Sequence, residues 1–365
     1  MKNTKKTRSP ALDLIRIFAL FCVVSLHFFL YSGYYETTIL GGSLYLATLA
    51  RSFFMICVPL FLLLTGYLMR HKKATKTYYA KLIRIIGEYV LASMFCMVSL
   101  AVYHGEGLID TIKVFLLQIP GIFSFEAAIY SWYVEMYIGL FLLIPYLNIL
   151  YNGLDTKRAK QGLIFTMLLL SGIPEILNSA IFTLPWTMWY NDPSGVLTLF
   201  PNWWANLYPV TFYFIGAYLS EYSLPLSKKK ALLLLAISNL LTGTVSYLNS
   251  MGTTFNWGSW QTYQSLFVIV QAVMIFWLFL QLDFCHIGSR SRKLIALLSD
   301  LSFSAYLVSS VYDIFFQQII GKITGSPVYS PLLYFVLVPL ILFCSLVTAY
   351  ILVSVYKLIQ RFFIR

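Results

Sequence analysis

The stretch ALDLIRIFALFCVVSLHFFL, residues 11–30, places Arg16 and His27 inside a long run of apolar residues. An α-helix rises about 1.5 Å per residue, so a run of this length crosses a hydrocarbon core of about 30 Å. A charged side chain at the centre of a bilayer costs roughly 2.5 to 3.5 kcal/mol. The stretch therefore predicts a membrane-spanning helix whose polar residues have a partner or a water-filled cavity.

The whole chain has the composition of a membrane protein. Of its 365 residues, 59% are hydrophobic and 11% are charged, against roughly 25% charged residues in ordinary soluble domains. Because similar apolar stretches recur from end to end, we expect an all-α, polytopic membrane bundle of about ten transmembrane helices. The predicted spans are residues 11–32, 52–70, 82–103, 131–151, 161–183, 206–222, 231–249, 264–283, 297–320 and 332–356.

The distribution of positive charge predicts the topology. Nearly all of the 26 Lys and Arg residues fall in the connections on one side of the predicted spans. The other side holds only Arg51, Lys113 and Lys322, and Arg16 lies within a span. By the positive-inside rule, the basic side and both termini are cytoplasmic. The net charge of +12 thus reflects topology, and we expect no nucleic-acid partner.

The chain shows no internal repeat or linker, which predicts a single integral-membrane domain over residues 1–365. The five cysteines contain no C-x-x-C pair, and the four histidines are scattered over different segments. We therefore expect no metal site.

Arg16 and His27 are related by helix geometry. At about 100° per residue, positions eleven apart return to nearly the same face, about 16 Å apart along the axis. One stripe of the first span then runs from Arg16 near the cytoplasm to His27 near the outside. The alternative is that Arg16 reaches the inner headgroups and His27 packs as a satisfied core residue.

Two carboxylates are predicted at a depth similar to that of His27. Glu135 lies about one turn below the outer surface in the fourth span, and Asp313 lies in the outer half of the ninth. Since a lone ionised group is unstable in lipid, we expect the three side chains to share one polar cavity. Ordinary polar contacts between helices are the alternative for both carboxylates.

On the cytoplasmic side, basic residues concentrate over residues 70–89. Topology and attraction to anionic membrane lipid explain the lysines of this loop. Arg84, at the mouth of the third span, is better placed to meet a phosphorylated ligand that enters the bundle. A thin donor with a phosphate-rich head and a reactive tip would fit a passage from Arg16 and Arg84 to His27.

Three connections on the outer side are longer than a turn. Residues 104–130 contain an apolar piece that predicts a short interfacial helix. Residues 184–205 and 250–263 are rich in Trp, Tyr, Asn and Gly. These two connections form either an aromatic belt at headgroup depth or a surface that faces carbohydrate.

The sequence resembles acyltransferase family 3, the integral-membrane acyltransferases. The resemblance spans the chain and is carried by Arg16 and His27, by FFMICVPLFLLLTGYL and YYAKLIRIIGEY in the second and third spans, by SWYVEMYIGLFLLIPYLN in the fourth, and by LSFSAYLV in the ninth. In many members a histidine follows the YL pair of the ninth span, whereas this chain has Ser309 there. It also departs at Gly87, where many members have proline.

The resemblance implies a multi-pass enzyme of the bacterial plasma membrane that takes an acyl group, commonly acetyl, from cytoplasmic acyl-CoA. The expected acceptor is a hydroxyl of an envelope polysaccharide or of a lipid-linked saccharide. We expect acetyl-CoA to bind at Arg16 and Arg84 and His27 to act as general base, with Glu135 orienting its ring and Asp313 as a further catalytic residue. An acyl-enzyme on His27 is the alternative route.

A transporter or exporter of a small polar metabolite is the second functional hypothesis. Ionisable residues within the membrane also build substrate and proton pathways. Many secondary transporters contain inverted repeats, and none is visible in this sequence. Consumption of acetyl-CoA would separate the two hypotheses.

Overall fold

The computed structural model describes residues 8–105, 107–178, 202–324 and 331–363. These residues are helical apart from connections, and the extended pairing among them is one isolated bridge between Ile39 and Met251. The helices are α1 (Pro10–Tyr31), α2 (Gly42–Phe54), α3 (Cys57–Met69), α4 (Lys76–Tyr103), α5 (Leu108–Phe123), α6 (Trp132–Asn152), α7 (Lys157–Ser171), α8 (Pro174–Leu177), the 3₁₀ turn η3 (Ala205–Leu207), α9 (Tyr208–Leu219), α10 (Lys228–Ser250), the 3₁₀ turn η4 (Ser259–Gln261), α11 (Leu266–Leu280), α12 (Ser289–Thr324) and α13 (Pro331–Phe363).

The all-α polytopic bundle predicted from the sequence is confirmed. Within the described residues, 8 helical segments are long and apolar enough to cross a membrane, and α2 with α3 counts as one of them. The shorter helices α9 and α11 coincide with the sixth and eighth predicted spans. Each predicted span therefore corresponds to a helix.

The fifth predicted span is interrupted, because α7 stops at Ser171 and Pro174 opens the short α8. A helix, α5, forms between α4 and α6 as predicted. Most of the connection predicted over residues 184–205, and the predicted end of the fifth span at residue 183, lie outside the described residues.

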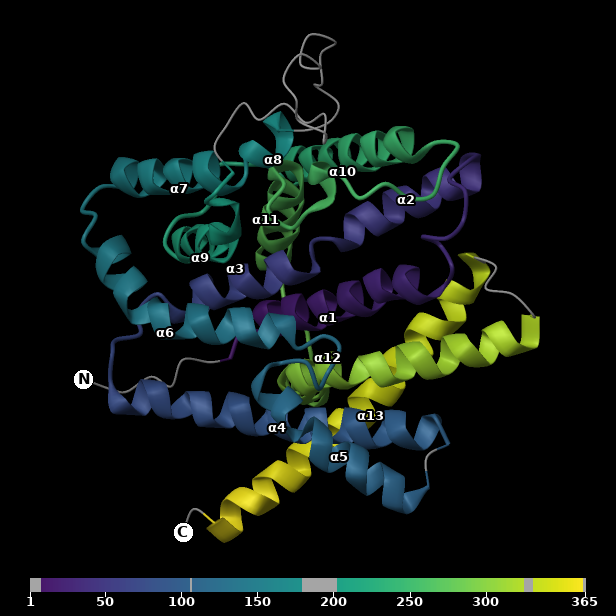
Figure 1. Ribbon diagram of the computed structural model, residues 1–365. Helices are drawn as coiled ribbons and strands as arrows, with labels where there is room; N and C mark the ends of the chain where they lie inside the picture. The colour runs from purple at the N-terminus through teal and green to yellow at the C-terminus, as the bar shows by residue number, and fades with distance from the viewer. Residues whose placement is uncertain (1–7, 106, 179–201, 325–330, 364–365) are drawn as a thin grey trace.

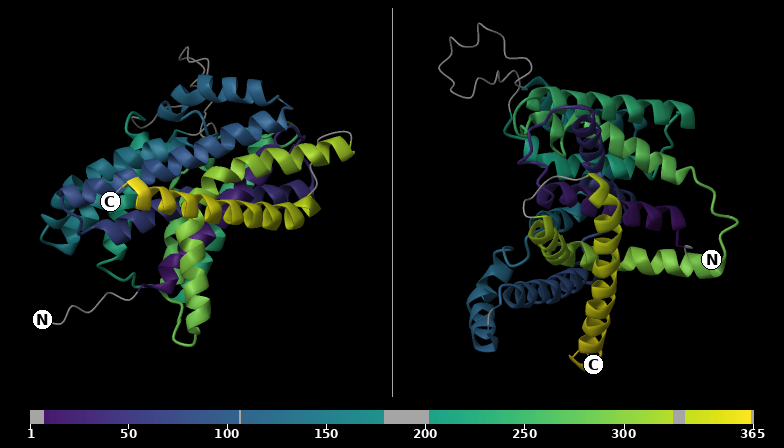
Figure 2. Two further views of the ribbon diagram at one scale, coloured as in Figure 1. Left: turned by 90° about the horizontal axis from the view of Figure 1, so that it is seen from below. Right: turned by 90° about the vertical axis from the view of Figure 1, so that its right-hand side faces the viewer.

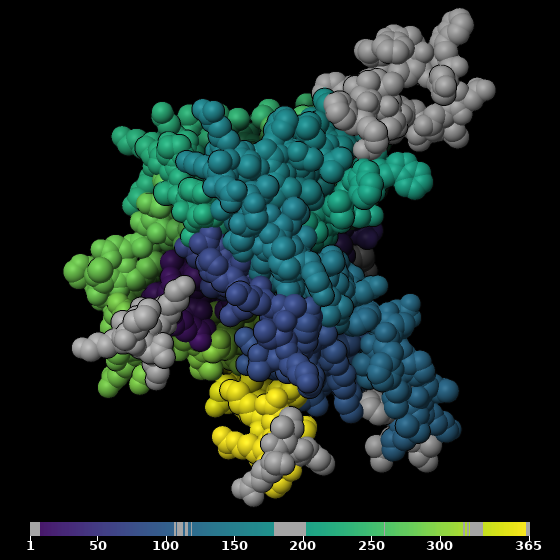
Figure 3. Space-filling view, turned by 90° about the vertical axis from the view of Figure 1, so that its left-hand side faces the viewer, coloured from purple at the N-terminus to yellow at the C-terminus, as the bar shows by residue number. Residues whose placement is uncertain are grey.

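Helix α1 lies in the middle of the bundle. It packs against α2 and α3 on one flank and against α12 and α13 on the other, and α12 and α13 lie side by side (Figures 1 and 2). In the view of Figure 3, α1 in purple reaches the surface between α4 in blue and α12 in light green. We call this face the basic end, because α4, α7 and α10 begin there with lysines.

A cluster of charges joins three helices at the basic end. Arg70 Nη1 lies 2.8 Å from Glu221 Oε2, and Lys160 Nζ lies 2.9 Å from both oxygens of the same carboxylate. Partial burial alone would raise the pKa of Glu221, but the hydrogen bond and charge of Lys160 and the charge of Arg70 lower it below its ordinary value. The ionised carboxylate therefore ties together the ends of α3 and α9 and the start of α7.

Helices α3 and α9 approach each other so closely that only glycine fits at the contact. A Cβ added at Gly66 would lie 2.0 Å from the carbonyl oxygen of Tyr213, and one added at Gly216 would lie 2.1 Å from that of Leu63. Small residues at a membrane helix interface let the two backbones meet and gain van der Waals contact. The glycines thus set the distance between α3 and α9.

We expect Gly66→Ala to lower the stability of the bundle by about 1 to 3 kcal/mol, because the added methyl group must push α9 away. The measurement is the thermal midpoint of the purified protein in one detergent. Gly139→Ala on α6 is the matched control, since a Cβ there meets no described atom within 4 Å. Equal thermal midpoints for the two variants would show that the close contact between α3 and α9 does not determine the stability of the bundle.

Candidate functional site

His27 lies in a buried group with two side chains from other parts of the chain. Its side chain is 12% exposed, and its Nδ1 lies 3.6 Å from Oδ2 of Asp313 on α12, which is fully buried. The hydroxyl of Tyr130, just before α6, donates to the same Oδ2 at 2.8 Å. The Tyr130 ring stacks on the imidazole with centroids 3.7 Å apart. The structure therefore brings His27 and Asp313 together, as expected from their depth.

Both polar groups of this pair retain unused hydrogen-bonding capacity. His27 Nδ1 and Asp313 Oδ1 are shielded from solvent and have no hydrogen-bond partner in the described part of the chain. A separation of 3.6 Å is longer than a direct hydrogen bond, so a small approach or a bridging water would satisfy Nδ1. With Nδ1 held toward the carboxylate, Nε2 is the nitrogen available to a substrate.

Glu135 does not join this group. It is exposed on α6, and no hydrogen bond or ion pair connects it to His27 among the described residues. Its neighbours Tyr133 and Val134 are the buried ones at this point of the helix. The expected depth of Glu135 did not fix its direction around the helix axis. We expected Glu135 to orient the His27 ring, but the carboxylate that the structure places beside the ring is Asp313.

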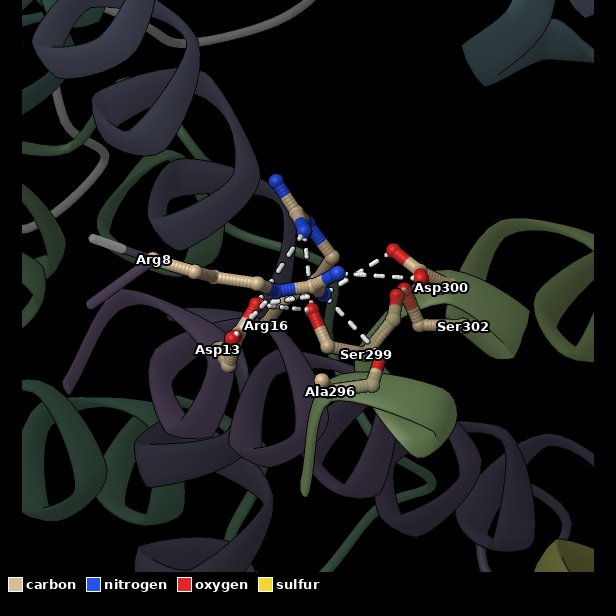
Figure 4. Close-up of polar contacts among 7 residues, drawn as sticks. All are labelled: Arg8, Asp13, Arg16, Ala296, Ser299, Asp300 and Ser302. Atoms are coloured by element: carbon tan, nitrogen blue, oxygen red, sulfur yellow. Dashed lines mark hydrogen bonds and ion pairs between the residues drawn. The ribbon is translucent and has the colours of Figure 1, made fainter. Parts of the chain in front are cut away.

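Arg16 belongs to a second polar network at the start of α1, drawn in Figure 4. Its Nη1 donates to Ser299 Oγ at 2.8 Å and lies 3.8 Å from Asp13 Oδ1. Ser299 in turn donates to Asp13 Oδ1 at 2.8 Å. One edge of the guanidinium is thus held by α1 and α12, while its other nitrogens point away from Asp13 and Ser299 (Figure 4).

Arg8 completes the network. It makes a two-pronged contact with Asp13 at 2.6 and 2.8 Å and also donates to Asp300 at 2.9 and 3.0 Å. Hydrogen bonding to these two carboxylates raises the pKa of Arg8 above its ordinary value, although partial burial opposes the shift. Arg8 therefore stays charged and links the start of α1 to α12.

A cavity of about 280 Å³ opens beside Arg16. Arg16 and Arg84, the two arginines singled out in the sequence, both line this cavity. Arg84 is 57% exposed and its Nε lies 2.8 Å from the buried Glu88, which also accepts from Ser304 at 3.1 Å. The remaining lining is mostly apolar and aromatic: Val23, Val58, Phe61, Leu64, Thr65, Leu68, Met69, Ile85, Tyr133, Tyr137, Ser299, Asp300, Ser302, Phe303 and Tyr306.

Aromatic rings separate this cavity from His27. Val23, one turn before His27 on α1, lines the cavity, but His27 itself does not. Tyr306 also lines it, donates a hydrogen bond to the Tyr130 carbonyl, and stacks on the Tyr130 ring at 6.1 Å. Since Tyr130 stacks on His27, the rings of Tyr306 and Tyr130 connect the lining of the cavity to the imidazole.

Several functional candidates were missed in the sequence. Asp13 stands one turn before Arg16 in the same span, which is the spacing of a helical ion pair and could have drawn attention to it. Ser299 and Tyr130 carried no such signal, because their role depends on which helices are neighbours. Ser309, where many relatives have histidine, is buried and donates to the Tyr306 carbonyl at 2.9 Å.

The parts of the chain that the structure describes contain no group of three His, Cys, Asp or Glu residues that could hold a metal ion. No curated protein and no solved structure matches the chain. A family model described as an acyltransferase domain matches residues 9–353. That match covers α1 to most of α13, including Asp13, Arg16, His27 and Asp313, so the chain belongs to this family and is an acyltransferase.

Proposed function

We propose that the protein is a membrane O-acyltransferase that moves an acetyl group from cytoplasmic acetyl-CoA to a hydroxyl of an envelope polysaccharide or lipid-linked saccharide. The observation that carries this proposal is the pairing of two sites on one helix. Arg16 lines a cavity at the basic end of α1, and His27, near the other end, has a buried carboxylate partner. We place the basic end in the cytoplasm of a bacterial plasma membrane, as the charge distribution predicts.

The basic end suits the donor. Arg16 and Arg84 offer guanidinium groups to phosphate, which binds arginine in a bidentate manner. The apolar and aromatic lining beyond them suits a narrow, mostly uncharged arm that carries the thioester. Passage to His27 requires movement of Tyr306 or Tyr130, since their rings close the cavity on that side.

The His27 group suits proton transfer. In the proposed step, Nε2 of His27 takes the proton of the acceptor hydroxyl as its oxygen forms a bond to the thioester carbonyl carbon. The carbon–sulfur bond then breaks, and the departing thiolate receives that proton. Asp313 stabilises the transient imidazolium and fixes the tautomer that leaves Nε2 free. Tyr130 holds both partners, because it stacks on the ring and donates to the carboxylate.

We expect His27→Ala to abolish acetyl transfer while leaving membrane insertion intact, because a general base contributes a factor of about 10² to 10⁴. The assay follows acetyl-CoA consumption by the purified protein in the presence of an envelope-glycan fraction. The control is His286→Ala, which removes an exposed histidine from the connection before α12. Near-normal turnover of the His27 variant would make this histidine a packing residue.

Asp313→Asn should lower kcat by roughly 10²-fold, because the amide cannot stabilise an imidazolium charge. Glu135→Gln should be close to wild type, since this carboxylate is exposed and does not contact the ring. Both variants are assayed beside His27→Ala with saturating acetyl-CoA. The reverse order of effects would return Glu135 to the catalytic group.

For Arg16→Lys we expect a rise in KM for acetyl-CoA of about 10-fold with a smaller change in kcat, because an ammonium keeps the charge but loses the planar fork. Arg158→Lys, in the exposed first turn of α7, is the matched substitution outside the cavity. An unchanged KM in the Arg16 variant would leave this arginine with a purely structural role beside Asp13.

A further inference from the structure

Arg51 on α2 is a buried cation without an anionic partner. The residue is 1% exposed. Nε donates to the hydroxyl of Tyr35 and Nη1 to Oε1 of Gln261, each at 2.9 Å. Throughout the described segments, no carboxylate pairs with this guanidinium and no acceptor meets Nη2. A buried charge that lacks a counter-ion is costly and marks a place where an anion would be stabilised.

Three aromatic rings surround the guanidinium, and one of them, that of Trp257, reaches the surface. Its central carbon lies 4.6 Å from the ring centroid of Phe255, 5.0 Å from that of Trp257 and 5.8 Å from that of Tyr35. Trp257 is 62% exposed and stacks on Tyr35 with centroids 4.6 Å apart. We call Arg51, Tyr35, Phe255, Trp257 and Gln261 the Arg51 site.

The loop that supplies half of this site is held in place from two directions. The backbone of Ile39 exchanges hydrogen bonds with Thr253 and Gly252 at 2.8 and 3.0 Å. Farther along the loop, Thr262 and Gln264 donate to the buried carboxylate of Glu175 at 3.0 and 3.1 Å. The Trp257 platform is therefore fixed before any ligand arrives, which reduces the entropy lost on binding.

An aromatic belt at headgroup depth does not account for these features. Belt tryptophans are anchored by their own amphipathic rings and need no buried cation beneath them. An exposed Trp257 ring with the positive charge of Arg51 close to it instead matches a ligand that has an apolar face and an anionic group. Sugar rings have such a face, and a carboxylate or phosphate substituent supplies the charge that Arg51 lacks.

We infer that the Arg51 site binds an acidic saccharide, with a sugar face on Trp257 and the anionic group directed to Arg51. The site lies at the end of α1 opposite the basic end, where His27 is located, since Tyr35 follows α1 closely in the chain. This inference rests on the proposed function for its biological meaning, because the bound saccharide would be the acceptor of the acyl group. Binding itself is a property of the site and is measured without catalysis.

The test compares two matched probes on the full-length protein in a detergent without sugar groups. One probe is a tetrasaccharide that contains glucuronic acid, and the other is the same tetrasaccharide with its carboxyl groups reduced to alcohols. We expect the acidic probe to bind at least about 10-fold more tightly, the range of one charge-assisted hydrogen bond. Equal affinities would overturn the inference.

Three variants assign the effect to the site. Arg51→Gln should remove the preference for the acidic probe, and Trp257→Ala should weaken binding of both probes. Trp203→Ala is the matched control, because Trp203 is 92% exposed and outside the site. If Arg51→Gln fails to fold, the inference is still tested by two measurements. These are the affinity of Trp257→Ala for both probes and the preference of the wild-type protein for the acidic probe. Unchanged binding in Trp257→Ala, or Arg51-dependent binding of phosphatidylglycerol in place of the saccharide, would contradict the inference.

Transfer assays separate this inference from the proposed function. If the wild-type protein acetylates both probes equally and shows no binding preference, the acidic-saccharide inference fails and the acyltransferase proposal stands. If neither probe nor any envelope-glycan fraction is acetylated while the preference and its loss in Arg51→Gln persist, the site stands and the proposed function fails.

Discussion

A titratable side chain that is buried in an apolar bundle must find its partner inside the protein, and α1 carries Asp13, Arg16 and His27 along its length. Helix α12 meets this requirement at both ends. Ser299 and Asp300 serve the start of α1, and Asp313 serves His27. The eleven residues from Arg16 to His27 and the fourteen from Ser299 to Asp313 cover comparable lengths of helix, so two helices that run in the same direction can be in register at both points. The rest of the bundle is arranged around this pair.

The same constraint separates two groups of polar side chains, one at each end of α1. At the basic end, two arginines have spare donors toward a cavity, while Asp13 and Glu88 hold each of them by one edge. Near the other end, a histidine and a carboxylate are shielded from solvent by Tyr130. The aromatic wall of Tyr306 and Tyr130 keeps the two regions apart. The acyl transfer across the membrane that we propose would need such a barrier, because an open passage would let water and protons through.

Close packing elsewhere keeps this arrangement rigid. The backbones of α3 and α9 touch at Gly66 and Gly216, which leaves α3 as a firm wall for the cavity. Arg51 differs from the other buried charges, because aromatic rings and neutral oxygens take the place of a carboxylate. That difference is the reason to regard it as a site for a ligand.

The sequence by itself determined the helices and the stripe that joins Arg16 to His27, because hydropathy and the helical repeat are properties of one segment at a time. It also placed His27 and Asp313 at one depth and Arg16 and Arg84 at another, since depth follows from distance to the end of a span. Only the tertiary structure decided which side chains meet at each depth. In the sequence, Glu135 was the favoured partner of the His27 ring and Asp313 the second candidate, but the rotation of α6 turns Glu135 outward and the packing of α12 turns Asp313 inward. Asp13, Ser299 and Tyr130 gained their roles in the same way, because a contact between helices depends on rotation and neighbourhood, and neither is encoded in the periodicity of a single helix.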